Sequence, residues 1–255
     1  MSRPNITNIC GVGIIYRKNN PKELFCEMKD NGYPIKLGRG QLCFIGGNWI
    51  GESAKSDKNP FHTYCRELNE ELTFSRPIRN SSEYAALGIS DNQQFAPTTI
   101  NAKPTQEDIE ELAHLKQKVI SGAIPFQDWI HMVEKSALDS ADPQNQRQGF
   151  TALCSYYSTA LNESEWNKLM RLSQKFGNLS SESQTLFISL EEIVKKKVQW
   201  LFGHGQALQS FFMSLGFQLA KKMPTVANIK STKIGKPLGT YQEYLKRYDV
   251  EKKPV

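Results

Sequence analysis

Three short, largely apolar runs, the first of them rich in β-branched residues, precede the first strong helix signal in this chain of 255 residues. The runs are residues 10–17, 23–28 and 41–45. Turn residues follow the first two, Asn19-Asn20-Pro21 after one and Asp30-Asn31-Gly32 after the other. Runs of this length and composition are typical of buried strands, and the first two are expected to form a hairpin. The third leads directly into Gly46-Gly47. The N-terminal part of the chain is therefore expected to build a sheet.

The helix signal is the Asn-Pro pair at 59–60, because Asn is a favoured N-cap and Pro is favoured at the first helical position. The pattern predicts a helix over 60–72. At 100° per residue, Glu67, Glu70 and Glu71 fall together on one side of it. The opposite side is an apolar stripe made of Phe61, Tyr64, Cys65, Leu68 and Leu72. This helix is predicted to pack through one face and to present three carboxylates on the other.

Helix and strand patterns continue through the rest of the chain. Thr105 to Asp108 resembles a capping box that opens a helix to about Ile120, and a second helix is predicted from Phe126 to Ala137. Later elements are predicted as strands over 150–161 and 185–189 and helices over 165–176 and 206–220. The order of strands, helix, helical insert, strands and helix predicts an α+β fold, with a mixed sheet between helices in an α/β/α sandwich.

Composition and charge suggest one domain with an appended tail. A hydrophobic content of 39% and a charged content of 23% are ordinary for one sizeable globular core. We expect a domain over residues 5–220, with 100–148 as a helical insertion and 221–255 as a basic C-terminal tail. The tail holds nine basic residues and three acids, which accounts for the whole net charge of +6. Such a tail suits RNA or another acidic partner, and a solvated, partly ordered tail is the plainer alternative.

The sequence also predicts a cytoplasmic protein without a membrane span. No run approaches the roughly 18 apolar residues that a membrane helix needs, and the N-terminus lacks the apolar core of a secretory signal. The five cysteines are odd in number and form no Cys-x-x-Cys pair, so we expect reduced thiols in a reducing compartment.

The residues of the predicted carboxylate helix and of the loop before it form a spaced pattern. The pattern is Gly46-x5-Glu52-x13-Arg66-Glu67-Leu68-x-Glu70-Glu71. It resembles the Nudix box, the signature of the Nudix hydrolase family, Gly-x5-Glu-x7-Arg-Glu-U-x-Glu-Glu-x-Gly-U, where U is aliphatic. Two departures stand out. The loop between Glu52 and Arg66 is six residues longer than the family's, and Thr73 and Phe74 replace a Gly and an aliphatic residue.

The resemblance implies hydrolysis of a phosphoanhydride (diphosphate) bond in a nucleoside diphosphate linked to another group, with Mg²⁺ or Mn²⁺ as cofactor. Mg²⁺ prefers hard oxygen ligands, neutralises phosphate charge and makes a bound water nucleophilic. By resemblance, the metal ligands are Glu67, Glu70 and Glu71, and Glu67 also helps to deprotonate the water. Arg66 is implied to hold a carboxylate in place by a bidentate pair, with Glu52 as the expected partner.

The family often adds a further catalytic Glu from a loop before a late strand. Glu182 is the candidate here, with Glu163 and Glu165 as alternatives. Trp49 and His204 lie where they could contact substrate, although packing is a competing explanation for each. With the two glycines that precede the helix, the candidate substrate-binding residues are Gly46, Gly47, Trp49 and His204.

Two other function classes fit the same sequence. The departures from the family pattern leave room for a non-catalytic Nudix-fold module that binds a nucleotide or RNA, with the basic tail as a clamp. A structural domain that binds a protein partner through the helical insertion is the third possibility.

Overall fold

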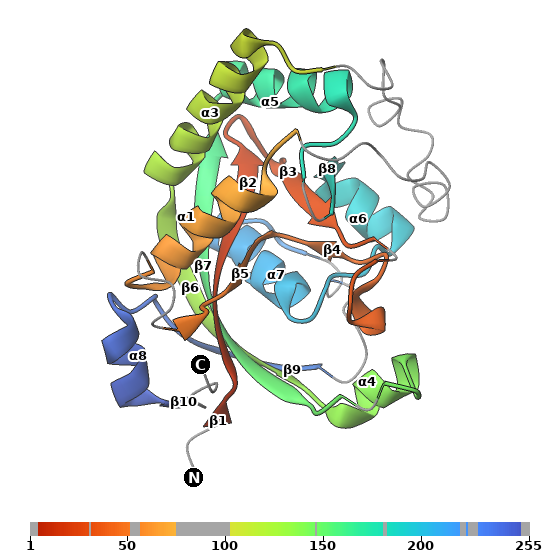
Figure 1. Cartoon of the computed structure of the whole chain (residues 1–255), viewed down its shortest axis with the longest axis vertical. Helices are drawn as coiled ribbons and strands as arrows, with labels where there is room; N and C mark the ends of the chain where they lie inside the picture. The colour runs from red at the N-terminus through yellow and green to blue at the C-terminus, as the bar shows by residue number, and fades with distance from the viewer. Residues whose placement is uncertain are drawn as a thin grey trace.

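A mixed β-sheet forms the centre of the molecule (Figure 1). The computed structural model describes residues 5–30, 32–51, 57–74, 103–145, 147–180, 183–219, 223 and 229–250. Within these residues the strand order is β4-β3-β2-β7-β6-β9, and β5 and β8 join the sheet by pairing with β2 and β3. The β2–β7 pair is parallel, and the other described pairs of this sheet are antiparallel. The fold is therefore α+β with a mixed sheet, as the sequence predicts.

The strands of the large sheet are β2 (Asn8–Arg17), β3 (Asn20–Met28), β4 (Leu42–Cys43), β5 (Ile45–Asn48), β6 (Ile124–Val133), β7 (Phe150–Leu161), β8 (Gln184–Ser189) and β9 (Ile229–Gly235). A second small sheet pairs β1 (Asn5–Ile6) with β10 (Asp249–Val250). The helices are α1 (Pro60–Glu71), α3 (Gln106–Ser121), α4 (Lys135–Ala141), α5 (Glu163–Phe176), α6 (Leu190–Lys196), α7 (His204–Ser214), α8 (Tyr241–Arg247) and the 3₁₀ turn η1 (Lys36–Gly38).

Helices α1, α3 and α5 pack together on one face of the sheet, in the upper part of Figure 1. Their core includes Tyr64, Leu68, Leu115, Trp166 and Leu169 from the helices and Ile15, Phe25 and Tyr157 from the strands. Burying each such side chain contributes about 1.5–3 kcal/mol relative to exposure. Gly11 lets the start of α1 lie directly on β2, because a Cβ there would be 1.9 Å from the Pro60 carbonyl oxygen.

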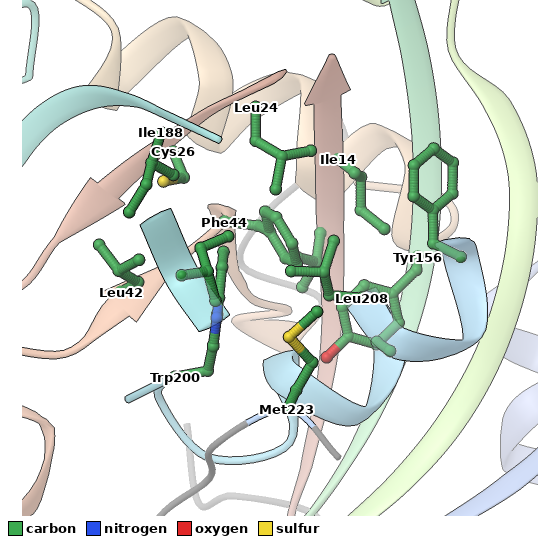
Figure 2. Close-up of a cluster of buried hydrophobic side chains, with 14 of the residues drawn as sticks. Ile14, Leu24, Cys26, Leu42, Phe44, Tyr156, Ile188, Trp200, Leu208 and Met223 are labelled. Carbon is green, nitrogen blue, oxygen red and sulfur yellow. The ribbon is translucent and has the colours of Figure 1, made fainter. Parts of the chain in front are cut away.

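A second core lies against the other face, beneath α6 and α7 (Figure 2). Figure 2 shows side chains from distant segments gathered in this cluster, among them Leu24 of β3, Leu208 of α7 and Met223. The ring of Phe44 packs on Trp200 with their centroids 4.8 Å apart. This core fills one part of the face and leaves an opening beside β5.

Most predicted elements are confirmed with small shifts at their ends, but the helix predicted over 206–220 already ends at Ser214, and the run 41–45 is divided between β4 and β5. The capping signals work as expected: Asn59 accepts a hydrogen bond from the His62 N–H at 2.9 Å, and the Thr105–Asp108 capping box opens α3. The predicted strand over 150–161 coincides with β7.

The predicted helix from Phe126 to Ala137 is wrong, because most of that segment is β6. Strand β6 lies inside the sheet between β7 and β9, so Asp128 and His131 are buried and hydrogen-bonded instead of solvated. Residues 100–148 are therefore not a purely helical insertion, since this stretch supplies a strand as well as α3 and α4.

The expected basic tail is likewise built into the fold from residue 229 onward. Strand β9 pairs with β6, and β10 pairs with β1 at the other end of the chain. Tyr241 and Tyr244 of α8 are buried against Ile6, Ile9 and Leu153. A separate tail over 221–255 does not fit these elements, because apolar residues between the lysines anchor the segment.

All five cysteines are free thiols, and Cys26, Cys43 and Cys154 are buried. Among the helices of the described residues, none combines the length and apolar character needed to cross a membrane.

Candidate functional site

A cavity of about 550 Å³ opens beside β5, within the size range of small-molecule sites. Its floor comes from β2 and β7, whose residues Cys10 and Cys154 are register partners. The remaining wall comes from β5, α1, the segment after β3 and the turn before α7. Glu67 and Glu71 are the two carboxylates among its lining residues. The carboxylate helix predicted from the sequence therefore contributes two carboxylates to the lining of this cavity.

Helix α1 is fixed in place by its apolar stripe. Tyr64, Leu68 and Leu72 are buried, and Leu72 ends the helix by donating its backbone N–H to the Leu68 carbonyl. The three carboxylates were expected to share one face of the helix, but they differ in exposure. Glu71 is 2% exposed as a residue, whereas the side chain of Glu70 is 58% exposed. The three glutamates thus occupy different environments.

Glu71 is held from two sides. Its Oε2 accepts the backbone N–H of Gly46 at 3.2 Å, and its Oε1 lies 3.6 Å from the Lys29 ammonium. Gly46 has a φ of +152° and leaves no room for a Cβ, which would lie 2.3 Å from the Gly11 carbonyl oxygen. In the described structure this glycine positions Glu71 as well as lining the cavity.

Glu67 stands one helical turn before Glu71 and also lines the cavity. A Cβ at Gly47 would lie 2.3 Å from the Glu67 carboxyl carbon, so the glycine makes space for this carboxylate. The Glu67 Oε1 atom is 2.9 Å from Arg66 Nη1, which is also 2.9 Å from Glu70 Oε2.

Arg66 joins the helix to the loop before it and to β5. Its Nε donates to Asp57 Oδ2 at 3.0 Å, and its Nη2 donates to the Asn48 carbonyl at 3.0 Å. The Asp57 carboxylate is buried and also accepts from Thr63 Oγ1. Among the described residues, the buried carboxylate that Arg66 holds is Asp57, while the expected partner Glu52 lies outside them.

A buried lysine stands next to Glu71. The Lys29 Nζ donates to Ser183 Oγ at 2.9 Å and to Glu27 Oε2 at 3.3 Å, in addition to its approach to Glu71. Burial alone would lower the pKa of Lys29, but the Cys43 thiol and the two carboxylates raise this pKa well above its ordinary value. The ammonium therefore stays charged, and it ties β3, α1 and the start of β8 together.

The carboxylates fit a magnesium ion in part. Among the described residues, no three His, Cys, Asp or Glu side chains converge closely enough to hold a metal by themselves. Mg²⁺ is commonly held by one or two carboxylates, with water and substrate phosphates completing its shell. Glu67 and Glu71 meet that requirement, since both line the cavity one turn apart. Glu70 is paired with Arg66 outside the lining, so the expected third ligand does not join them.

Two of the three candidates for an additional catalytic Glu, Glu163 and Glu165, do not line this cavity. The third, Glu182, lies outside the described residues. Glu163 pairs with Arg17, and Glu165 accepts the backbone N–H of Asn162 in the cap of α5.

The two predicted aromatic contacts differ in outcome. Trp49 stacks on Tyr241 with ring centroids 4.0 Å apart and belongs to the core beneath α8, so it does not line the cavity. Sequence could not reveal this packing, because its partner is far along the chain. His204 does line the cavity, where it stacks on Phe44 and accepts that residue's backbone N–H at 3.1 Å.

Several cavity residues escaped the sequence analysis. Lys29 had a visible signal in the sequence, because Glu27 near the end of β3 and Lys29 just after it alternate with the apolar residues Cys26 and Met28. The other missed residues had none, since they meet only through the fold: Arg147, Phe150 and Phe202.

Comparisons with known proteins add little to this picture. No family model matches the sequence, and no curated protein matches it. Among solved structures, the chain is similar to a NUDIX hydrolase from Alicyclobacillus acidocaldarius, with a TM-score of 0.36 and 10% identity. That alignment covers 88% of this chain and 87% of the other. A TM-score this low does not establish a common fold. The candidate site is therefore defined by the residues of this chain alone.

Proposed function

We propose that this chain is a divalent-metal-dependent hydrolase that cleaves a diphosphate bond in a nucleotide-type substrate. The observation that carries the proposal is the pair Glu67 and Glu71, one turn apart in the wall of a cavity large enough for such a substrate. The resemblance of residues 46–74 to the Nudix box supports the same chemistry.

In this proposal Glu67 and Glu71 hold the metal, and Glu67 also helps to take a proton from the attacking water. When bound, Mg²⁺ neutralises charge on the phosphate oxygens and lowers the pKa of a coordinated water. The Gly46 N–H and the Lys29 ammonium keep the Glu71 carboxylate in position. Arg66 does the same for Glu67 while it is anchored on Asp57. Prior positioning of these groups is worth most when the surrounding cavity excludes bulk water.

Lys29 supports a second candidate function, a module that binds a nucleotide without cleaving it. An ammonium 3.6 Å from Glu71 already balances part of the carboxylate charge that a metal would otherwise balance. RNA or another acidic partner at the basic C-terminal segment remains a separate prediction.

The test is metal-dependent turnover of a panel of diphosphate compounds: ADP-ribose, NADH, dinucleoside polyphosphates, nucleoside triphosphates and capped RNA. We expect cleavage of at least one class with Mg²⁺ or Mn²⁺, and a loss of about 100-fold or more in Glu67→Gln and Glu71→Gln. Glu107→Gln is the matched control, because Glu107 lies in the first turn of α3 and outside the cavity lining. Nucleotide binding without turnover of any compound would favour the binding module instead.

A further inference from the structure

Aromatic and cationic residues line the same cavity as the two carboxylates. Phe150, at the start of β7, and Phe202, in the turn before α7, meet edge to face with ring centroids 5.1 Å apart. His204 follows Phe202 by two residues, and Arg147 precedes Phe150 by three. All four residues line the same cavity as Glu67 and Glu71.

Phe202 is held in a backbone conformation that its side chain disfavours. Its φ is +44°, in the left-handed region that costs a non-glycine residue free energy. Among the described residues, the other non-glycine residue with a positive φ is Lys197. Its left-handed conformation is common for the residue that caps the C-terminus of a helix, here α6. Phe202 ends no helix, and its ring is only half-buried beside the cavity. Strain of this type is often retained where it directs a side chain at a ligand.

His204 supplies a neutral hydrogen-bond donor to the same region. Burial lowers its pKa to about 3, so the ring is uncharged. Its Nδ1 accepts the Phe44 N–H, which leaves the ring proton on Nε2. Among the described residues Nε2 has no hydrogen-bond partner, although the residue is only 9% exposed. By contrast, the other buried imidazole, His131, uses both nitrogens, on Ser231 and Tyr156.

Arg147 supplies a positive charge. Its Nη2 donates to the Pro34 carbonyl at 3.2 Å, and it forms no ion pair with any described carboxylate. A guanidinium has five N–H donors in a fixed fork that matches phosphate and carboxylate oxygens. One backbone contact leaves most of that capacity for an anionic ligand.

We infer that Phe150, Phe202, His204 and Arg147 form a subsite for the base and adjacent phosphate of a nucleotide. The phenyl rings contact the face of the base, the His204 Nε2–H donates to an acceptor on the base or sugar, and Arg147 binds a phosphate oxygen. This inference deepens the proposed function by assigning the substrate's nucleoside half, and it rests on that function only for the presence of a diphosphate that reaches Glu67 and Glu71.

Binding measured without metal tests the subsite separately from hydrolysis. The probes are the four nucleoside 5′-monophosphates, the matching nucleosides and ribose 5-phosphate, titrated into the full chain in EDTA by calorimetry. Phe202→Gly should weaken the best-bound monophosphate and its nucleoside at least about ten-fold, as expected for a lost base–aromatic contact, and leave ribose 5-phosphate unchanged. Arg147→Met should weaken the monophosphate and ribose 5-phosphate but not the nucleoside.

The choice of glycine separates binding from folding. Glycine accepts positive φ without strain, and this relief offsets part of the packing lost with the ring, so Phe202→Gly should remain folded at the assay temperature while it loses affinity. Phe126→Ala is the matched aromatic control, because Phe126 packs on Phe211 outside the cavity lining. It should lower the melting temperature and leave affinity unchanged.

The inference is overturned if wild-type protein binds none of the probes, or if Phe202→Gly binds the monophosphate as tightly as wild type. Loss of affinity in both variants combined with no turnover of any diphosphate would keep the subsite and reject the hydrolase.

Discussion

At the scale of single residues, the site depends on how buried charges are matched. Lys29 donates hydrogen bonds to Ser183 and Glu27, and its ammonium lies 3.6 Å from Glu71, so one cation balances two carboxylates from different elements. The Glu27 Oε1 atom is buried without a hydrogen-bond partner among the described residues. Removing the lysine would leave two buried carboxylates without their cation. This loss is expected to lower the free energy of unfolding far more than replacing all the charged partners by apolar residues would.

Lys29→Met is therefore expected to destabilise the protein by about 3–5 kcal/mol, the usual cost of breaking a buried ion pair from one side. Chemical denaturation monitored by tryptophan fluorescence measures this change. Lys36→Met is the control, because Lys36 is half-exposed and pairs with Asp142 in contact with solvent, where such pairs are worth about 0–1 kcal/mol. Equal effects of the two substitutions would contradict the network.

At the scale of elements, packing explains both the successes and the failures of prediction from sequence. Helix α1 and the capping boxes follow from local patterns, since Asn59 and Thr105 act on N–H groups within the same turn. Strand β6 does not, because its polar residues find partners far away in the chain. Asp128, for example, accepts the hydroxyl of Tyr244 in α8 at 2.9 Å. No local pattern around Asp128 in the sequence predicts Tyr244 as its partner.

Asp128 gives this link between β6 and α8 a pH dependence. Burial outweighs the hydrogen bond from the Tyr244 hydroxyl and raises the pKa of Asp128 to about 6. Its unfolded pKa is about 3.9, so the folded state holds the proton more tightly. The resulting stabilisation is full below about pH 4, is lost as the pH rises through 6, and then stays constant.

Asp128→Asn should therefore gain stability relative to wild type by about 2–3 kcal/mol between pH 4 and pH 7.5, because Asn does not titrate. The measurement is the free energy of unfolding of both proteins at the two pH values. Any effect of the Asn side chain that does not depend on pH cancels when the two stability differences are subtracted. A difference that does not change with pH would show that Asp128 titrates normally.

At the scale of the whole molecule, the cavity forms where chain segments from across the sequence meet. Glu67 and Glu71 could be predicted from their spacing on one helix. Arg147, Phe202 and His204 reach the same hollow only because the chain returns to β2 and β5 after α3 and β6 are in place. The predicted carboxylate face was also divided by the fold, which directs Glu71 inward and Glu70 outward. The packing of α1 thus determines which of the three glutamates line the cavity, namely Glu67 and Glu71.

The most direct measurement of this division is the rate of metal-dependent hydrolysis as a function of Mg²⁺ concentration, compared for wild type, Glu70→Gln and Glu71→Gln on whichever compound is cleaved fastest. We expect Glu70→Gln to keep the maximal rate and the half-saturating Mg²⁺ concentration within about two-fold, since its side chain is 58% exposed and its ion pair with Arg66 lies in contact with solvent. Glu71→Gln should lose about 100-fold or more. Equal losses in the two variants would contradict the two-carboxylate site and restore the three-glutamate set that the sequence alone suggests.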